Sequence, residues 1–377
     1  MKFDNVSALD LGSLSLKIYG ASHAEKIGVE CSGLPQGEKI DMDELLLFLK
    51  RRAPGQSSTA TPRKEADLPV FVSGMDGDVL CGDLCAEIYN KNTKSSDYKS
   101  TSFVPRPGHA DLPARITFGD EYDLSGGGHF SGRMTAPLCI AGGIALQLLK
   151  KRGIRIAAHA EEIASVRDRR FSENENTLDD VLLLNERAKC GGILTFSDEA
   201  SEKMTERILN AASEGDSVGG IIECAAAGLP MGLGRHMFDS VESTVSRLAF
   251  AVPGVKGIEF GAGFSVSSLK GSQNNDGYRY NADGRLCLTS NKAGGILGGM
   301  TSGAPLIFRV AMKPTPSISK EQDSVDLRTK ENVRLSVKGR HDPCIVGRAI
   351  PVIEAVCALS ILSLILEEEK RERSCDC

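Results

Sequence analysis

The 377-residue sequence contains no tryptophan, and aromatic residues make up only 5% of it. Proteins that bind single-stranded nucleic acids stack bases on aromatic side chains, so we expect no such platform here. An excess of basic residues is missing too, because 45 lysines and arginines face 50 acidic residues and give a formal net charge of −5. This balance argues against a general nucleic-acid-binding protein, which needs a basic surface. Any anion site must therefore be a local cluster of basic side chains.

A continuous apolar segment is also missing from residues 1–12, so we expect no signal peptide. One apolar run, at 350–366, resembles a membrane span, but it contains Pro351 and Glu354. The run is also shorter than the ~20 residues that a span needs. We expect a buried helix there, in the core or at a subunit contact, and a disordered polar tail at 367–377. The sequence thus predicts a cytoplasmic protein without a membrane segment.

The eleven cysteines form no disulfide framework, because most of them stand singly in apolar or glycine-rich surroundings. Cys81 and Cys85 are close in sequence, and the tail carries Cys375 and Cys377, but no second pair completes a zinc site. The six histidines never occur at the spacing of metal ligands. We therefore expect free thiols in a reducing compartment and no metal site.

Forty glycines are present, many of them in doublets and triplets between apolar segments. They indicate tight turns and places where the backbone approaches a ligand. Capping patterns and apolar periodicity predict helices at 41–52, 135–152, 177–189, 201–214, 240–251 and 350–366. Strand-like runs lie at 28–31, 217–227, 256–260, 285–289, 306–312 and 334–338.

These helices and strands alternate without the regular spacing of a doubly wound sheet, and no linker divides the chain. We expect a single α+β domain over residues 1–377. Long polar segments at 90–111, 274–283 and 315–329 are expected to be functional loops.

Four loops combine glycine or proline with ionisable side chains. The first, at 20–24, contains His23 and by itself could be a surface turn. The second, at 51–67, places Arg51 and Arg52 before a proline-glycine turn and two further basic residues after it. Forked guanidinium groups in such a cluster suit phosphate or carboxylate binding. Two arginines at the end of a helix could equally complement the helix dipole.

The third feature is a pair of loops at 105–111 and 125–133, and the fourth joins 313–317 to 339–343. Glycine-rich backbone that leads into a helix is a general cradle for anions or cofactors, although no Walker or dinucleotide motif is present. The third pair could be a structural hairpin, but its two arginines and a histidine favour a site. In the fourth, a cation, an imidazole and a carboxylate stand in sequence beside a proline. This favours acid–base chemistry over a solvated turn.

In this order, the loops resemble those of chorismate synthases. The likeness runs from about Leu11 to Leu366 through the motifs Gly20-Ala-Ser-His23, Arg51-Arg-Ala-Pro-Gly-Gln56, Arg106-Pro-Gly-His-Ala-Asp111, Gly126-Gly-Gly-His-Phe-Ser-Gly-Arg133, Gly261-Ala-Gly-Phe264, Gly271-Ser-Gln-Asn-Asn-Asp276, the segment 291–299, Lys313-Pro-Thr-Pro-Ser-Ile318 and Gly339-Arg-His-Asp-Pro-Cys344. The resemblance implies a β-α-β sandwich, with a helical layer between antiparallel sheets, and a homotetramer. It also implies the loss of phosphate from 5-enolpyruvylshikimate 3-phosphate to give chorismate. The implied cofactor is reduced FMN, with electrons from an external, NADPH-dependent reductase.

The resemblance further implies roles for individual residues. Substrate binding falls to Ser22, Arg52, Arg106, Arg133, Arg340 and Arg348. Catalysis falls to His23, His109 and Asp342, with one histidine near the leaving phosphate, the other near the flavin ring, and the carboxylate relaying a proton. Flavin contacts are implied for His129, Phe130, Ser131, Pro253, Gly254, Gly298, Lys313, Pro314, Thr315, Pro316, Ser317 and Arg340.

The chain departs from the usual family pattern at several positions. Ala21 and Ala24 replace the glutamate and second glycine of the usual Gly-Glu-Ser-His-Gly loop, and Ser58 replaces a common basic residue. His129 and Phe130 replace an Arg-Ser pair. These departures keep a non-catalytic flavin- or anion-binding homologue open as the alternative, with a glycine-rich structural oligomer as a third. Retention of both loop histidines and the aspartate favours the enzyme.

Overall fold

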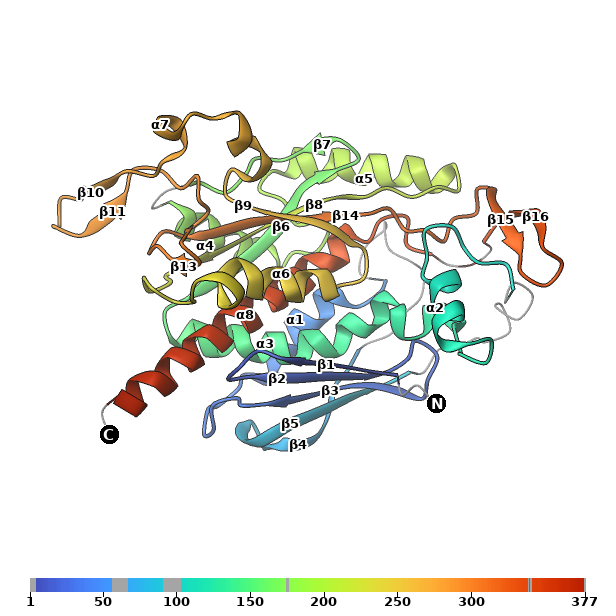
Figure 1. Ribbon diagram of the computed structural model, residues 1–377, viewed down its shortest axis with the longest axis horizontal. Coiled ribbons are helices and arrows are strands. Elements are labelled where there is room, and N and C mark those ends of the chain that lie inside the picture. Colours follow the sequence, from blue (N-terminus) through green and yellow to red (C-terminus); the bar gives the residue numbers. More distant parts are fainter. Residues whose placement is uncertain are drawn as a thin grey trace.

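The computed structural model describes residues 5–55, 67–90, 103–173, 176–337, 339 and 341–375, and it has three main layers (Figure 1). The first layer is a five-stranded antiparallel sheet in the order β1-β2-β3-β5-β4. Its strands are β1 (Val6–Asp10), β2 (Ser15–Gly20), β3 (Lys26–Ser32), β4 (Val70–Asp76) and β5 (Val79–Tyr89). Only one face of this sheet packs on the helices, so the strands alternate buried and exposed side chains.

The second sheet also has five antiparallel strands, in the order β7-β6-β8-β14-β9. Its strands are β6 (Arg155–Ile163), β7 (Val166–Arg167), β8 (Gly220–Ala227), β9 (Val255–Phe260) and β14 (Leu306–Met312). This sheet is covered on both faces. Cys224 and its partner Phe308 belong to the main core, whereas Ala225 and its partner Ile307 pack in a second cluster on the opposite face. That alternation explains why β8 and β14 are apolar along almost their whole length.

Helices fill the space between the two sheets (Figure 1). They are α1 (Met42–Arg52), α3 (Thr135–Lys151), α6 (Val241–Ala251) and α8 (Val346–Cys375). Helix α3 packs on β3 and β5, while α8 packs on β6 and β8. The expected α+β sandwich with a helical layer between antiparallel sheets is therefore confirmed. Helix α4 (Thr177–Arg187) covers the outer face of the second sheet. Helix α5 (Asp198–Ser213) contacts β6 and β7 of the same sheet.

The remaining elements lie around this sandwich. They are α2 (Asp111–Phe118), α7 (Gly271–Asn274), the short 3-10 helices η2 (Ser125–Phe130), η3 (Gly132–Met134), η4 (Met237–Asp239) and η5 (Gly263–Ser268), and the hairpins β10–β11 (Tyr278–Tyr280, Leu286–Leu288), β12–β13 (Ile296–Leu297, Met300–Thr301) and β15–β16 (Gln322–Asp326, Glu331–Leu335). Two of the segments expected to be wholly loops thus contain strands, namely β10 and β15.

The six predicted helices are present, but some ends differ. Helix α5 begins at Asp198, before the predicted start at 201, because the Ser197 side chain caps it and accepts a hydrogen bond from the Ala200 amide at 3.1 Å. Helix α8 continues to Cys375, so the expectation of a disordered tail from residue 367 is wrong as far as Cys375. The charged end of α8 prolongs a helix whose first part is buried.

Two helical stretches are long and apolar enough to cross a membrane, at Gly132–Lys151 and Val346–Glu372. Their apolar windows are 89% and 94% buried inside the fold, as in core helices. Glu354 interrupts the second stretch and is held in the core by two partners. Arg51 binds it through both guanidinium nitrogens at 2.7 and 2.9 Å, and the Ala158 amide donates to it at 3.0 Å.

Candidate active site

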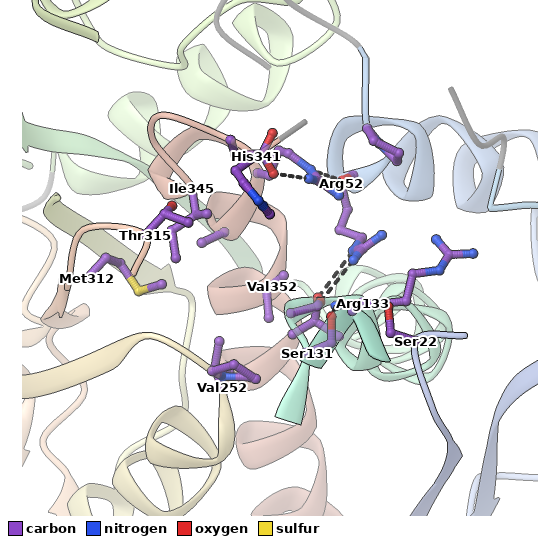
Figure 2. Close-up of a pocket in the computed structure, with 18 of the residues that line it drawn as sticks. Ser22, Arg52, Ser131, Arg133, Val252, Met312, Thr315, His341, Ile345 and Val352 are labelled. Carbon is purple, nitrogen blue, oxygen red and sulfur yellow. Dashed lines mark hydrogen bonds and ion pairs between the residues drawn. The ribbon is translucent and has the colours of Figure 1, made fainter. Parts of the chain in front are cut away.

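A cavity of ≈ 240 Å³ lies where the end of α1 meets the beginnings of α3 and α8. Its walls differ in chemistry (Figure 2). Arginine and hydroxyl side chains, including Ser22, Arg52 and Arg133, form one wall. Val252 and Met312 belong to an apolar wall on the opposite side. A ligand that fills this space meets cations on one face and hydrocarbon on the other.

Arg52 and Arg133 are both buried and share the carboxylate of Asp67. Nη1 of Arg52 lies 2.6 Å from Oδ2 of Asp67, and Nη1 of Arg133 donates to Oδ1. Burial alone would raise the pKa of Asp67, but the two guanidinium groups lower it below its usual value. Asp67 is therefore ionised, and the sequence motifs gave no sign of its role because its partners come from distant segments.

Arg348 forms another part of the cationic wall. Its Nε donates to the main-chain carbonyl oxygen of Arg52 at 3.0 Å, and its Nη1 donates to Asp342. Burial, followed by the charge of Arg52, lowers the pKa of Arg348. A guanidinium titrates so far above neutral pH that the side chain stays charged. The predicted residues Arg348 and Asp342 thus meet at the cavity as an ion pair.

His23 is fixed by the glycine-rich segment before α3. Its Nδ1 donates to the carbonyl oxygen of Ser125 at 3.0 Å, so Nε2 is the basic atom of the neutral ring. Gly126 has a φ of 60°, and a Cβ atom there would lie 2.1 Å from Cε1 of His23. Glycine at this position therefore leaves the space that the histidine ring occupies.

The loop that carries His23 is held without the glutamate that Ala21 replaces. The Ser22 amide donates to Gly128 at 3.1 Å, and the Asn90 side chain donates to Ala24 at 2.7 Å. In both hydrogen bonds the acceptor is a main-chain carbonyl oxygen, so neither bond depends on the side chain at position 21. The departures at Ala21 and Ala24 thus leave the loop anchored on two sides.

Arg106 and His109 lie behind the cavity wall and do not line the cavity. Arg106 binds Asp111 at 2.7 and 2.8 Å and reaches Ser317 at 3.1 Å. Nδ1 of His109 lies 2.6 Å from the same carboxylate. Burial alone would raise the pKa of Asp111, but the interactions with Arg106 and His109 lower it well below its usual range. A Cβ atom at Gly127 would come within 3.2 Å of Nε2 of His109. His109 therefore lies directly beside the glycine-rich segment that precedes α3.

His341 lines the cavity and was not among the predicted catalytic residues. Burial, then the positive charge of Arg106, lowers its pKa, while Asp342 acts in the opposite direction. Its Nε2 is buried and has no hydrogen-bond partner among the described residues. The sequence did contain the signal, since His341 stands between the two motif residues that were chosen.

Some of the predicted flavin contacts lie at or near the cavity, and others do not. Ser131, Pro253 and Thr315 line the cavity, with Gly254 beside Pro253. The segment 313–317 packs against the Arg106 loop, where the Lys313 ammonium donates to the Gly108 carbonyl oxygen. Three residues point elsewhere. His129 bonds to Ser7 and Gly20, Phe130 packs with Phe118 and Tyr122, and Gly298 sits in the turn between β12 and β13.

Four further residues that the sequence singled out lie outside the described residues, namely Ser58, Arg63, Lys64 and Arg340. Across the described ranges, no group of three or more histidine, cysteine or acidic side chains could hold a metal ion. The polar side chains that line the cavity are arginines, histidines, an aspartate and hydroxyl groups. Such a set binds anions and moves protons.

The sandwich fold and this cavity define an α+β protein whose cavity has a cationic wall opposite an apolar one, which suits a small anionic ligand. Residues 14–366 match the family model described as chorismate synthase. The chorismate synthase of Lancefieldella parvula is 47% identical over 358 residues, which cover 93% of this chain and 94% of the relative. That of Pyrococcus abyssi is 42% identical, covering 94% of this chain and 96% of the relative. The chain belongs to the chorismate synthase family.

A solved structure described as a crystal structure of chorismate synthase has the same fold. Its TM-score is 0.73 at 23% sequence identity, with 95% of this chain and 93% of that chain covered. At this identity the likeness concerns the fold alone. The family model and the curated relatives confirm, at the level of the family, the resemblance inferred from the glycine-rich loops.

Proposed function

We propose that the protein is a chorismate synthase, a carbon–oxygen lyase that converts 5-enolpyruvylshikimate 3-phosphate into chorismate and phosphate. In this reaction a C–O bond to phosphate and a C–H bond break, a C=C bond forms, and phosphate and a proton leave. Substrate and product are at the same oxidation level. The observation that carries the proposal is the convergence of Arg52, Arg133 and Arg348 on one cavity wall, in a chain of this family.

The arginines suit the substrate because it carries two carboxylates and a phosphate. Forked guanidinium groups bind such groups through paired hydrogen bonds, which are stronger in a site that excludes water. Arg52 is the last residue of α1, Arg133 belongs to η3 just before α3, and Arg348 lies in the first turn of α8. A ligand that contacts all three is therefore held by three separate elements. Ser22 adds a hydroxyl to the same cavity.

We assign proton movement to His23 and Asp342, which line the cavity, and to His109, which lies outside its lining. His23 presents Nε2 as its basic atom, and His109 is oriented by Asp111. Asp342 lies at the cavity with Arg348 as its ion-pair partner. We assign the neutralisation of the leaving phosphate to one of these two histidines and the acceptance of the substrate proton to Asp342.

The cavity also suits reduced FMN. Val252, Met312 and Ile345 offer a flat aromatic ring an apolar surface opposite the cationic wall. Gly254 has a φ of 100°, and a Cβ atom there would approach Cδ1 of Ile345 within 2.9 Å, so glycine keeps this wall open. When bound, reduced FMN supplies an electron-rich ring beside the substrate. The residues that would hold it are Ser131, Pro253, Gly254, Thr315 and the rest of segment 313–317.

We further propose a cytoplasmic homotetramer that receives reduced flavin from a separate, NADPH-dependent reductase. Large aromatic side chains on the outside support the assembly, since Phe238 and Phe264 are each 85% exposed and Tyr280 is 75% exposed. Aromatic side chains are enriched at protein–protein contacts. Light scattering should give about four times the chain mass of 40.2 kDa. A monomer mass would reject the tetramer.

The activity is tested anaerobically with photoreduced FMN and 5-enolpyruvylshikimate 3-phosphate. We expect stoichiometric phosphate and chorismate from the wild type and a strong loss in His23→Ala and Asp342→Ala. His236→Ala is the matched control, because that histidine is exposed and lies outside the cavity, and it should keep full activity. A wild type that binds FMN but releases no phosphate would instead identify the non-catalytic homologue. With NADPH and oxidised FMN in air, little NADPH oxidation is expected.

A further inference from the structure

Asp67 is a buried carboxylate that joins two arginines of the cavity wall. Its side chain is 1% exposed, and its oxygens take separate partners, Oδ2 from Arg52 and Oδ1 from Arg133. Its backbone has a φ of 48°, a conformation that costs energy for a residue other than glycine. The fold therefore keeps an aspartate at an unfavourable backbone position where its carboxylate bridges the two guanidinium groups.

Other hydrogen bonds complete the orientation of each arginine. Arg52 donates from Nε to Thr135 at 3.2 Å and from Nη2 to the Gly132 carbonyl at 2.9 Å. Arg133 donates from Nε to the Asn90 side chain at 3.0 Å. These partners are all neutral. Asp67, by contrast, is a charged group that binds both guanidinium groups and so joins them to each other.

The charges explain why one shared carboxylate is useful. Two guanidinium groups beside each other repel in a buried site. One carboxylate between them compensates one of the two charges and leaves a net charge of about +1 on the trio. Two carboxylates would neutralise the wall and weaken its attraction for an anion. Without a carboxylate between them, the two buried guanidinium groups would repel each other and move apart.

We propose that Asp67 is a positioning residue, which fixes the relative orientation of Arg52 and Arg133 and sets their net charge for one anionic group of the substrate. This inference rests on the proposed function for its kinetic consequences. The net charge that Asp67 sets affects the binding of any small anion. Inorganic phosphate can therefore be used as a probe even without the reaction.

The test compares Asp67→Asn with the wild type. Asparagine keeps the size but offers an N–H group to one arginine, so that arginine must move. We expect kcat to fall about 10- to 100-fold, the effect of losing a hydrogen bond to a charged group. KM should stay equal or decrease, because the wall gains positive charge. Phosphate should raise the melting temperature of Asp67→Asn more than that of the wild type, since it replaces the missing negative charge.

Asp180→Asn is the matched control. Asp180 is a buried carboxylate that binds Arg169 at 2.7 Å and the Ser172 amide at 2.8 Å, and it lies outside the cavity. This variant should lose stability while kcat, KM and the phosphate-induced shift stay at wild-type values. Such a contrast separates positioning at the site from the general effect of breaking a buried ion pair.

Asp67→Glu keeps the negative charge with a longer side chain, and we expect it to recover part of the lost kcat and a wild-type response to phosphate. Wild-type kcat and KM in Asp67→Asn would overturn the proposal, as would a phosphate-induced shift no larger than that of the wild type. Equal defects in the Asn and Glu variants would also overturn it. If the wild type releases no phosphate from the substrate, the proposed function fails, while the comparison of melting shifts still decides the role of Asp67.

Discussion

Arg348 donates a hydrogen bond from Nε to the main-chain carbonyl oxygen of Arg52, over a distance of 3.0 Å. Arg52 is the last residue of α1, and the last carbonyl groups of a helix have no partner within it. Arg348 supplies that partner from the first turn of α8 and at the same time binds Asp342. One side chain therefore fixes two helix ends and a predicted catalytic carboxylate relative to one another.

Arg348→Lys should lower activity, because an ammonium group cannot replace the planar fork that reaches both partners. We expect kcat/KM to fall about 10- to 100-fold and stability to fall by about 1–3 kcal/mol. Steady-state kinetics and urea unfolding measure the two effects. Arg247→Lys is the control, since Arg247 also donates to a carbonyl oxygen, at 3.0 Å, but is exposed on α6. Equal kinetics for the Arg348 and Arg247 variants would contradict the assigned role.

Gly126→Ala should displace His23, because the new methyl group would lie 2.1 Å from its ring. We expect a loss of activity of at least about 100-fold, as general acid–base catalysis contributes at least that factor. Gly119→Ala is the matched control. Its φ of 88° also strains an alanine, but nothing lies within 4 Å of the added atom. Anaerobic turnover and thermal melting should therefore show similar losses of stability in both variants and a loss of activity in Gly126→Ala alone.

Much of the fold could be predicted from local signals. Helix α1 begins where Asp41 caps the Glu44 amide at 3.0 Å, as the capping pattern indicated. Strand β6 gave no such signal, because His159, Glu161 and Glu162 interrupt its apolar alternation. Those polar residues are tolerated only because partners from other segments meet them, and no local pattern announces such partners.

Site residues could be predicted where they belong to a sequence motif. Interactions between site residues that are distant in sequence could not be predicted. Arg52 and Arg133 stand in motifs, and the cavity brings them together. Asp67 follows Arg52 by 15 residues and precedes Arg133 by 66, so only the fold reveals that they share one carboxylate. The resemblance implied a flavin contact for His129, yet this side chain bonds to Ser7 in β1.

His341 should make stability depend on pH in the acidic range. Burial and the charge of Arg106 lower its pKa below the unfolded value of 6.5, whereas Asp342 opposes this. Below pH 6.5 the unfolded chain binds this proton before the folded one, so the folded state loses stability as the pH falls, by at most ~1.4 kcal/mol per pH unit. Urea unfolding of the wild type and His341→Gln at pH 7.5 and 5.5 measures this. Relative to the wild type, His341→Gln should be more stable at pH 5.5 than at pH 7.5. A difference in stability that is the same at both pH values would contradict the lowered pKa of His341.

His159 should have the opposite pH dependence. It is fully buried in β6, with Nε2 3.2 Å from Glu223 and Nδ1 3.7 Å from Asp168. Burial alone would lower its pKa, but the two carboxylates raise it above 6.5. The protonated ring therefore contributes stability that is fully present below pH 6.5 and is lost as the pH rises through the folded pKa. His159→Gln leaves the carboxylates without their cation and should cost about 3–5 kcal/mol at pH 6, as for other broken buried pairs. The cost should be smaller at pH 9, measured by urea unfolding. A cost that stays constant or grows with pH would show that the ring is neutral in the folded protein.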